Sequence, residues 1–139
     1  MYPSYKKGVK MKQVINADPH GKITLQGCDP VAFHTVGKAI KGDSTISTEY
    51  QGYKYLFSSE ANKAMFDEQV EKYLPAYGGY CAFGVANNLL FPVEIDTWEV
   101  IDDRLVLQYS QDVKQMFSKN INENIQKANE NWLKIQEGR

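Results

Sequence analysis

The sequence predicts an α+β fold in which two antiparallel β-hairpins pack with several short helices. The first observation is a pair of β-rich runs, 45–50 and 53–57, joined by a glutamine and a glycine. The second is a pair of runs, 98–102 and 105–109, that alternate apolar and polar residues around a charged turn. Both pairs are typical of hairpins. Apolar residues at helical spacing follow each pair, so we expect helices to lie against both hairpins.

Before the first hairpin, one short strand and one short helical turn are predicted. Residues 23–25 are the strand candidate. Asp29 is expected to cap the turn and Pro30 to occupy its first position, because these residue types favour the start of a helix. The turn is expected to run through Phe33 and to end at Gly37.

After the first hairpin, a helix is predicted over about residues 60–73, ending before Pro75. Ser58 and Ser59 are its candidate N-caps. Residues 77–88, YGGYCAFGVANN, fit neither a helical nor a strand period. We expect them to form a loop that enters a short buried helix, because paired glycines permit close approaches of the backbone.

Two more helices are predicted after the second hairpin. Ser110 is a candidate N-cap for the first of them. The second is expected to begin near Asn122, and its apolar stripe consists of Ile125, Ala128, Trp132 and Ile135.

Length and charge restrict both the organisation and the partners of the chain. At 139 residues and 15.8 kDa the chain suits one domain, placed at residues 22–135, after a leader over residues 1–21 that we expect to be poorly ordered. The formal net charge of -1 gives no field that would attract a polyanion, so nucleic acid is not an expected partner. Prolines and glycines interrupt the longest uncharged stretch, residues 73–93, and no membrane insertion is predicted.

Motifs and cysteine usage add further exclusions. No apolar stretch follows the basic N-terminus, so the chain as written is expected to be cytoplasmic, or periplasmic or exported if a signal has been trimmed. Its two cysteines are too few for a disulfide scaffold. Common nucleotide-binding, hydrolase and metalloprotease motifs are absent from the sequence, so we do not expect an enzyme.

Three segments carry a resemblance to a known family. Residues 25–33, LQGCDPVAF, resemble the LQGYDPVAY opening of YHS-domain proteins. Residues 50–66, YQGYKYLFSSEANKAMF, are similar to the core of that family, and residues 77–86 closely resemble its YGGYCAYGVA segment. The resemblance extends over about residues 22–135 and implies a small module whose hairpin-plus-helix core is related to treble-clef metal-binding folds. Members that stand alone mostly lack an assigned activity.

The resemblance also implies where a metal would bind. Metal-binding relatives place cysteines at the positions that are Ala32, Ser58 and Asn62 in this chain, so all three thiolates are missing. Hydroxyl and amide groups are poor ligands for soft metals.

A second set of residues offers a different ligand site. Cys28 and His34 stand where the family usually has aromatic residues, and Cys81 matches a cysteine of the family. If the segments that carry them pack together, these three side chains could offer soft ligands for copper(I) or zinc. Haem, with His34 or Cys28 as its axial ligand, is a further alternative. The other residues expected to line this pocket are Asp29, Tyr77 and Tyr80.

Structural roles explain the same residues without a ligand. Cys81 would serve as core filler, Asp29 as a helix cap and His34 as a turn or surface residue. A disulfide between Cys28 and Cys81 stays open, and so does a reactive, low-pKa thiol at Cys28 before a helix start.

The function we expect is therefore that of a non-enzymatic small-ligand or metal-ion binding module. Two alternatives stay open. One is a thiol-based redox or sensor protein that uses Cys28 and Cys81, and the other is a protein-interaction domain without a ligand, including a homo-oligomer.

Overall fold

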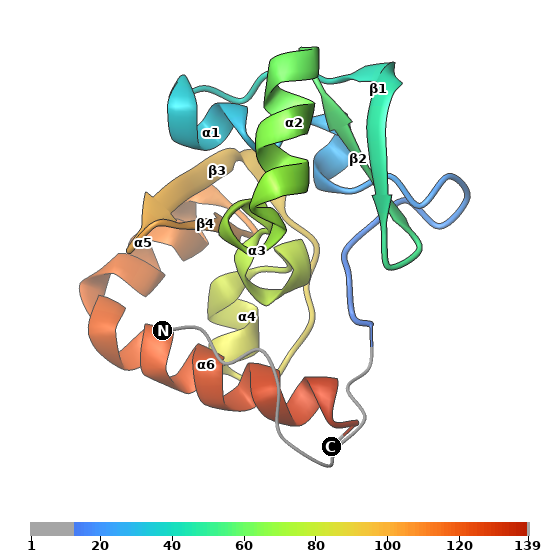
Figure 1. Ribbon diagram of the computed structural model, residues 1–139. Helices are drawn as coiled ribbons and strands as arrows, with labels where there is room; N and C mark the ends of the chain where they lie inside the picture. Colours follow the sequence, from blue (N-terminus) through green and yellow to red (C-terminus); the bar gives the residue numbers. More distant parts are fainter. Residues whose placement is uncertain (1–12, 139) are drawn as a thin grey trace.

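The computed structural model describes residues 13–138 and confirms the α+β class, with helices around two separate two-stranded antiparallel sheets (Figure 1). The first sheet pairs β1 (Asp43–Tyr50) with β2 (Tyr53–Phe57), and the second pairs β3 (Glu94–Ile101) with β4 (Arg104–Gln108). The helices are α1 (Ala32–Thr35), α2 (Glu60–Glu68), α3 (Val70–Tyr73), α4 (Ala82–Ala86), α5 (Gln111–Lys119) and α6 (Ile121–Gln136), and short 3-10 turns form η1 (Leu25–Gly27) and η2 (Ala76–Gly79). The relation to treble-clef folds stays a prediction.

Both predicted hairpins close through tight turns of the same kind. In the first turn, Gln51 and Gly52 have φ angles of 52° and 88°. In the second turn, Asp102 and Asp103 have φ angles of 50° and 66°. Positive φ at both central residues is typical of the type I′ turn, whose twist matches that of the flanking strands. The local sequence of each turn therefore sets the pairing of its strands.

The helix predicted over residues 60–73 is divided into α2 and α3. Its break lies at Gln69, whose φ of -138° and ψ of 62° leave the helical region. The backbone N–H of Gln69 donates to the carbonyl oxygens of Met65 and Phe66, and these bonds close α2. The change of direction allows Tyr73 of α3 to join Phe66 of α2 in the same group of buried side chains.

The strand predicted at residues 23–25 is wrong. Its first two residues make only isolated bridges, and η1 begins at Leu25. Residues 25–27 have φ angles of 53°, 53° and 84°, a left-handed run that a strand does not contain. Residues 77–79 of η2 form a second left-handed run.

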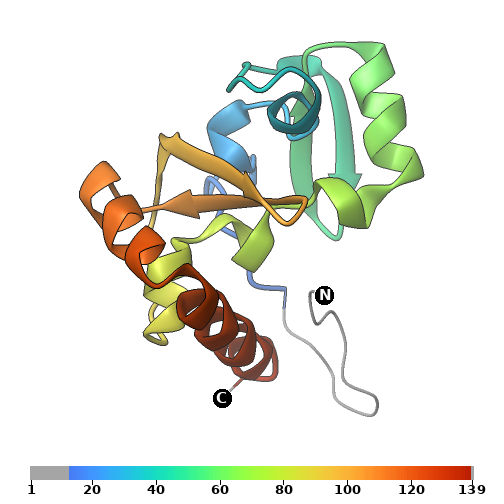
Figure 2. The ribbon, with the colours of Figure 1, turned by 90° about the vertical axis from the view of Figure 1, so that its left-hand side faces the viewer.

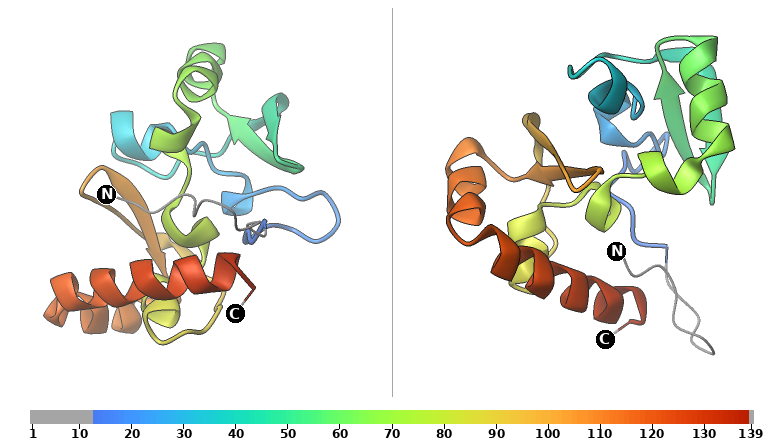
Figure 3. Two further views of the ribbon diagram at one scale, coloured as in Figure 1. Left: turned by 60° about the horizontal axis from the view of Figure 1, so that its bottom comes forward. Right: turned by 60° about the vertical axis from the view of Figure 1, so that its left-hand side comes forward.

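Three groups of buried side chains join these elements. The first lies between the first hairpin, α2 and α3, and the second links Phe33 of α1 to Leu105 of β4. The third surrounds Trp132 of α6 and includes side chains of α4 and α5. Figure 2 shows the second hairpin between the first hairpin and the helices α4 to α6, and Figure 3 shows α6 lying along α4. The second hairpin thus connects the two ends of the molecule.

Part of the predicted leader, residues 1–12, lies outside the described residues. From residue 13 on, the chain lies against η2, because the backbone N–H of Asn16 donates to the carbonyl oxygen of Gly78 at 2.8 Å. The side-chain amide of Asn16 donates to the carbonyl oxygen of Gly79 at 3.1 Å.

The domain boundaries at residues 22 and 135 stay predictions. Among residues 13–138, none of the helices has the length and apolar character needed to cross a membrane.

Candidate functional site

Asp29 is a fully buried carboxylate, with 0% of its surface exposed, at the start of α1. Its Oδ1 accepts hydrogen bonds from the backbone N–H groups of Val31, at 2.8 Å, and Ala32, at 3.3 Å. These contacts satisfy backbone donors that have no partner within the helix. Asp29 thus accepts from the first backbone N–H groups as predicted, but α1 begins at Ala32 with Val31 at its N-cap position, and Pro30 lies before the helix.

The second oxygen of Asp29 connects α1 to the junction between β2 and α2. Asp29 Oδ2 accepts from the backbone N–H and the Oγ of Ser58, both at 2.8 Å, and from Asn62 Nδ2 at 2.9 Å. Ser59, and not Ser58, caps α2, because its Oγ accepts from the backbone N–H of Asn62 at 3.1 Å. One carboxylate thus organises two helix starts that are about thirty residues apart in the sequence.

The side chains at the three positions that the resemblance assigns to metal-binding cysteines do not fit a soft metal. Ser58 and Asn62 donate their hydrogen bonds to Asp29, and the methyl group of Ala32 has no ligand atom. Soft metals prefer thiolate and imidazole ligands. A buried carboxylate with neutral hydrogen-bond donors therefore occupies the part of the fold where the relatives would bind a metal.

Cys28 lies in an apolar environment. It is buried with Phe33, Leu105 and Leu107, and its thiol is free. Burial raises the pKa of the Cys28 thiol, the positive charge of Lys41 acts in the opposite direction, and the negative charge of Asp29 raises it further. A raised pKa reduces the thiolate fraction, so these surroundings oppose the reactive, low-pKa thiol that the position before a helix suggested.

The side chain of His34 is buried and the residue lies in α1, so it is not the turn or surface residue that the sequence suggested. Its side chain is 5% exposed, and neither ring nitrogen has a hydrogen-bond partner. The ring lies edge-on to Tyr73, with centroids 5.3 Å apart, and Nδ1 is 4.0 Å from Asp103 Oδ1. Burial lowers the pKa of His34; Asp103 acts against this change, whereas Lys72 adds to it.

The lowered pKa of His34 predicts a loss of stability at mildly acidic pH. Below about pH 6.5, the unfolded chain binds a proton at this histidine more readily than the folded chain does. The free energy of unfolding should therefore be fully retained above about pH 7 and should fall as the pH drops toward 5. His34→Phe removes the titration and retains a ring against Tyr73, so it should flatten this part of the curve in urea denaturation.

His20→Gln is the matched control for this experiment, because His20 is exposed. It should leave the pH dependence unchanged. A His34→Phe protein that loses as much stability as the wild type between pH 7 and pH 5 would contradict the prediction.

Cys81 has a structural role at the start of α4, and its thiol is also free. Cys81 Sγ accepts from the backbone N–H of Gly84 and donates to Oε1 of Gln108, both at 3.4 Å. The same oxygen of Gln108 accepts from the backbone N–H of Phe83 at 3.0 Å. Gln108, which sequence reasoning missed, thus connects β4 to the start of α4 through its contacts with Cys81 and Phe83.

The structure does not bring Cys28, His34 and Cys81 together. Within residues 13–138, no three His, Cys, Asp or Glu side chains are grouped so that they could hold a metal ion. Tyr77 donates to Asn129 Oδ1 at 2.9 Å, and Tyr80 donates to the carbonyl oxygen of Ile15 at 3.4 Å. Both tyrosines thus contact parts of the chain outside the expected pocket.

An apolar cavity of about 560 Å³ lies beside Cys81, between α4, the loop that follows it and the start of α5. Phe91 and Tyr109 form one side of it, with ring centroids 5.9 Å apart, and they are 43% and 51% exposed. The wall is composed of Cys81, Phe83, Gly84, Asn87, Leu89, Phe91, Tyr109 and Val113. Cys81 is the one sequence-predicted site residue in this wall.

The loop beside this cavity is held by α4. The backbone N–H of Cys81 donates to the carbonyl oxygen of Phe91 at 3.1 Å, and the N–H of Leu89 donates to that of Gly84 at 2.8 Å. A Cβ at Gly84 would lie 3.1 Å from the ring of Phe91, so glycine allows the loop to lie close to the helix. Sequence reasoning missed Leu89 and Phe91, although three apolar residues in succession, 89–91, are an unusual run for a loop.

Comparison with known proteins gives one match. The family model of the YHS domain matches residues 31–77, which include α1, the first hairpin, α2 and α3. No curated protein and no solved structure matches the chain. The matched segment contains Ser58 and Asn62 and ends before the wall of the apolar cavity begins.

Proposed function

We propose that this chain, which carries a YHS domain at residues 31–77, is a non-enzymatic small-ligand-binding module whose ligand occupies the apolar cavity beside Cys81. The observation that carries the proposal is the cavity itself. Its volume of about 560 Å³ lies within the range of roughly 300–1,000 Å³ that is usual for small-molecule sites. Its wall is mostly aliphatic and aromatic, as such sites require.

The exposed rings of Phe91 and Tyr109 also support a ligand. Covering exposed aromatic surface is favourable, by about 25 cal/mol for each Å² that is removed from water. The donor set favours the small-ligand form of the module over the metal-ion form. Ser58 and Asn62 are engaged by Asp29, and the thiol of Cys28 lies among apolar side chains.

Titration with N-phenyl-1-naphthylamine, a neutral and apolar fluorophore, tests the proposal. The wild-type protein should bind the fluorophore saturably, with one molecule per chain. Tyr109→Ala and Phe91→Ala should each weaken binding roughly tenfold, because each removes an aromatic face from the cavity. Both side chains are partly exposed, so the variants should keep their fold.

Met65→Ala is the matched control, because Met65 is an exposed apolar residue on α2 outside the wall of the cavity. It should bind the fluorophore like the wild type. The proposal is wrong if the wild type shows no saturable binding, or if Tyr109→Ala and Met65→Ala bind equally well.

A further inference from the structure

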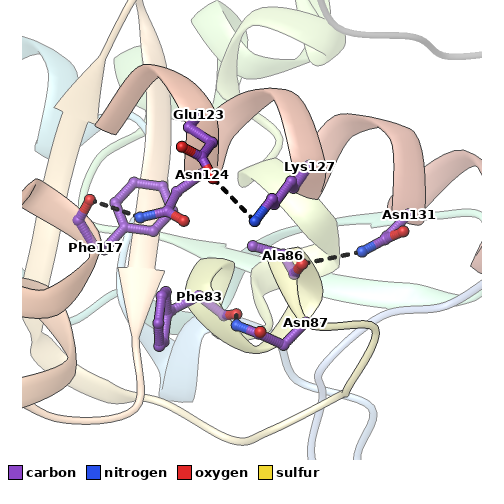
Figure 4. Close-up of polar contacts among 8 residues, drawn as sticks. All are labelled: Phe83, Ala86, Asn87, Phe117, Glu123, Asn124, Lys127 and Asn131. Atoms are coloured by element: carbon purple, nitrogen blue, oxygen red, sulfur yellow. Dashed lines mark hydrogen bonds and ion pairs between the residues drawn. The ribbon is translucent and has the colours of Figure 1, made fainter. Parts of the chain in front are cut away.

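The apolar cavity adjoins a second cavity of about 400 Å³, between α4, the end of α5 and the first half of α6. Phe83 and Asn87 belong to the walls of both cavities. Figure 4 shows Phe83 of α4 and Asn87, which directly follows that helix, next to the part of α6 that carries Asn124 and Lys127. A ligand that contacts both walls would have to pass these two side chains.

The two cavities differ in charge. The apolar cavity has no charged residue in its wall, whereas the second cavity has Lys119, Lys127 and Glu123. Two positive charges and one negative charge give the wall of the second cavity a net charge of +1. Lys127 Nζ is 3.0 Å from Glu123 Oε1, in an i,i+4 pair whose side chains are both more than half exposed. Such exposed pairs are weak, so Lys127 can turn toward an anionic ligand.

Two asparagine side chains in the wall of the second cavity are held by hydrogen bonds to backbone carbonyl oxygens. Asn87 Nδ2 donates to the carbonyl oxygen of Phe83 at 2.9 Å, and Asn124 Nδ2 donates to that of Phe117 at 3.0 Å. Figure 4 shows the bond between Asn124 and Phe117. An amide has two donor hydrogens and an acceptor oxygen, so each retains capacity for a polar ligand group.

We propose that the two adjoining cavities together bind one amphipathic anion, a small carboxylic acid with an aliphatic or aromatic body. The body would lie against Phe91 and Tyr109, and the carboxylate would lie near Lys119 and Lys127. This inference rests on the proposed function, because it requires that the apolar cavity binds a ligand. It further specifies that the ligand is an anion and which end of the ligand lies in each cavity. The argument for this occupant is the complementarity between a negative head group and the positive end of an otherwise apolar groove.

Competition between ligands of equal length and different charge tests the inference. Octanoate and octanol are titrated against the protein loaded with N-phenyl-1-naphthylamine. Octanoate should displace the fluorophore from the wild type. In the double variant Lys119→Gln/Lys127→Gln it should bind roughly fivefold more weakly, because two partly exposed charges are lost. Octanol should bind both proteins equally.

The control variant is Lys54→Gln/Lys63→Gln, which changes the net charge by the same amount at residues outside both cavities. It should bind octanoate like the wild type. If the fluorophore binds but octanoate has the same affinity for the wild type and the Lys119→Gln/Lys127→Gln variant, this inference is wrong and the proposed function stands. If the fluorophore does not bind, the proposed function fails as well.

Discussion

Replacing Asp29 with alanine is expected to lower the free energy of unfolding by about 4 kcal/mol. The carboxylate accepts hydrogen bonds from two backbone N–H groups at the start of α1 and from three donors of Ser58 and Asn62. Asp29, Val31 and Ala32 are fully buried, so water cannot replace the bonds to these two backbone groups, whereas Ser58 is exposed and Asn62 is half-buried. Leaving a buried donor without a partner costs about 1–3 kcal/mol, and the two buried backbone N–H groups of Val31 and Ala32 are affected at once. Urea denaturation at neutral pH measures the effect.

Asp43→Ala is the matched control for this prediction. Asp43 also accepts two hydrogen bonds, from the backbone N–H and the Oγ1 of Thr45, but its side chain is exposed. Water can take the place of the lost carboxylate there, so we expect a much smaller loss of stability than in Asp29→Ala. Equal losses in Asp29→Ala and Asp43→Ala would show that the buried network does not stabilise the fold.

Gly78→Ala should be nearly as damaging, with an expected loss of about 3 kcal/mol or more. Gly78 has a φ of 62°, which alanine adopts only with strain. In addition, a Cβ at this position would collide with the carbonyl oxygen of Val14 and would lie 3.0 Å from Cη2 of Trp132. The backbone of residue 14 cannot move aside without disturbing the bond between Asn16 and Gly78. The expected measurements are a lower urea midpoint and a changed fluorescence of Trp132.

Gly79→Ala separates strain from collision. Gly79 also has a positive φ, of 81°, but a Cβ there would meet its nearest atom, Pro75 Cγ, at 3.6 Å. This is an ordinary contact distance, so only the left-handed conformation should be costly, at about 1 kcal/mol. If the two variants lose equal stability, the contact of Gly78 with residue 14 is not a constraint on the fold.

The elements that could be predicted from the sequence are those that local residues determine. Gly52, Asp102 and Asp103 in the hairpin turns are of residue types that favour positive φ. Ser110 caps α5 by accepting from the backbone N–H of Val113 at 3.2 Å. The stripe on α6 was also predictable, and its members Ala128 and Trp132 are buried. In each case the signal and the structure that it determines lie within a few residues of each other.

The elements that could not be predicted depend on contacts between distant segments. The break at Gln69 has no proline or glycine to mark it, and it allows Tyr73 to reach the core. The left-handed run that begins at Leu25 replaces a strand that its apolar side chains favoured. Burial of His34 against Tyr73 follows from the placement of α3, which the residues next to His34 do not determine.

The candidate site shows the same division. The capping role of Asp29 was predictable because its donors at Val31 and Ala32 are neighbours in the sequence. The hypothesis for Cys28, His34 and Cys81 required three segments to meet at one point, and residue types alone could not decide that. The apolar cavity was missed because its wall comes from residues 81–91 together with Tyr109 and Val113.

The hydrogen-bond network of Asp29 has a consequence for where the chain can fold. The junction of α1, β2 and α2 contains a carboxylate, a hydroxyl, an amide and backbone N–H groups, and none of these is oxidised or reduced under cellular conditions. The junction can therefore form without a bound metal ion and without a particular oxidation state of cysteine. This junction of residues 29–62 therefore contains no thiolate and no metal ligand set, and its hydrogen bonds do not depend on whether the surroundings are reducing or oxidising.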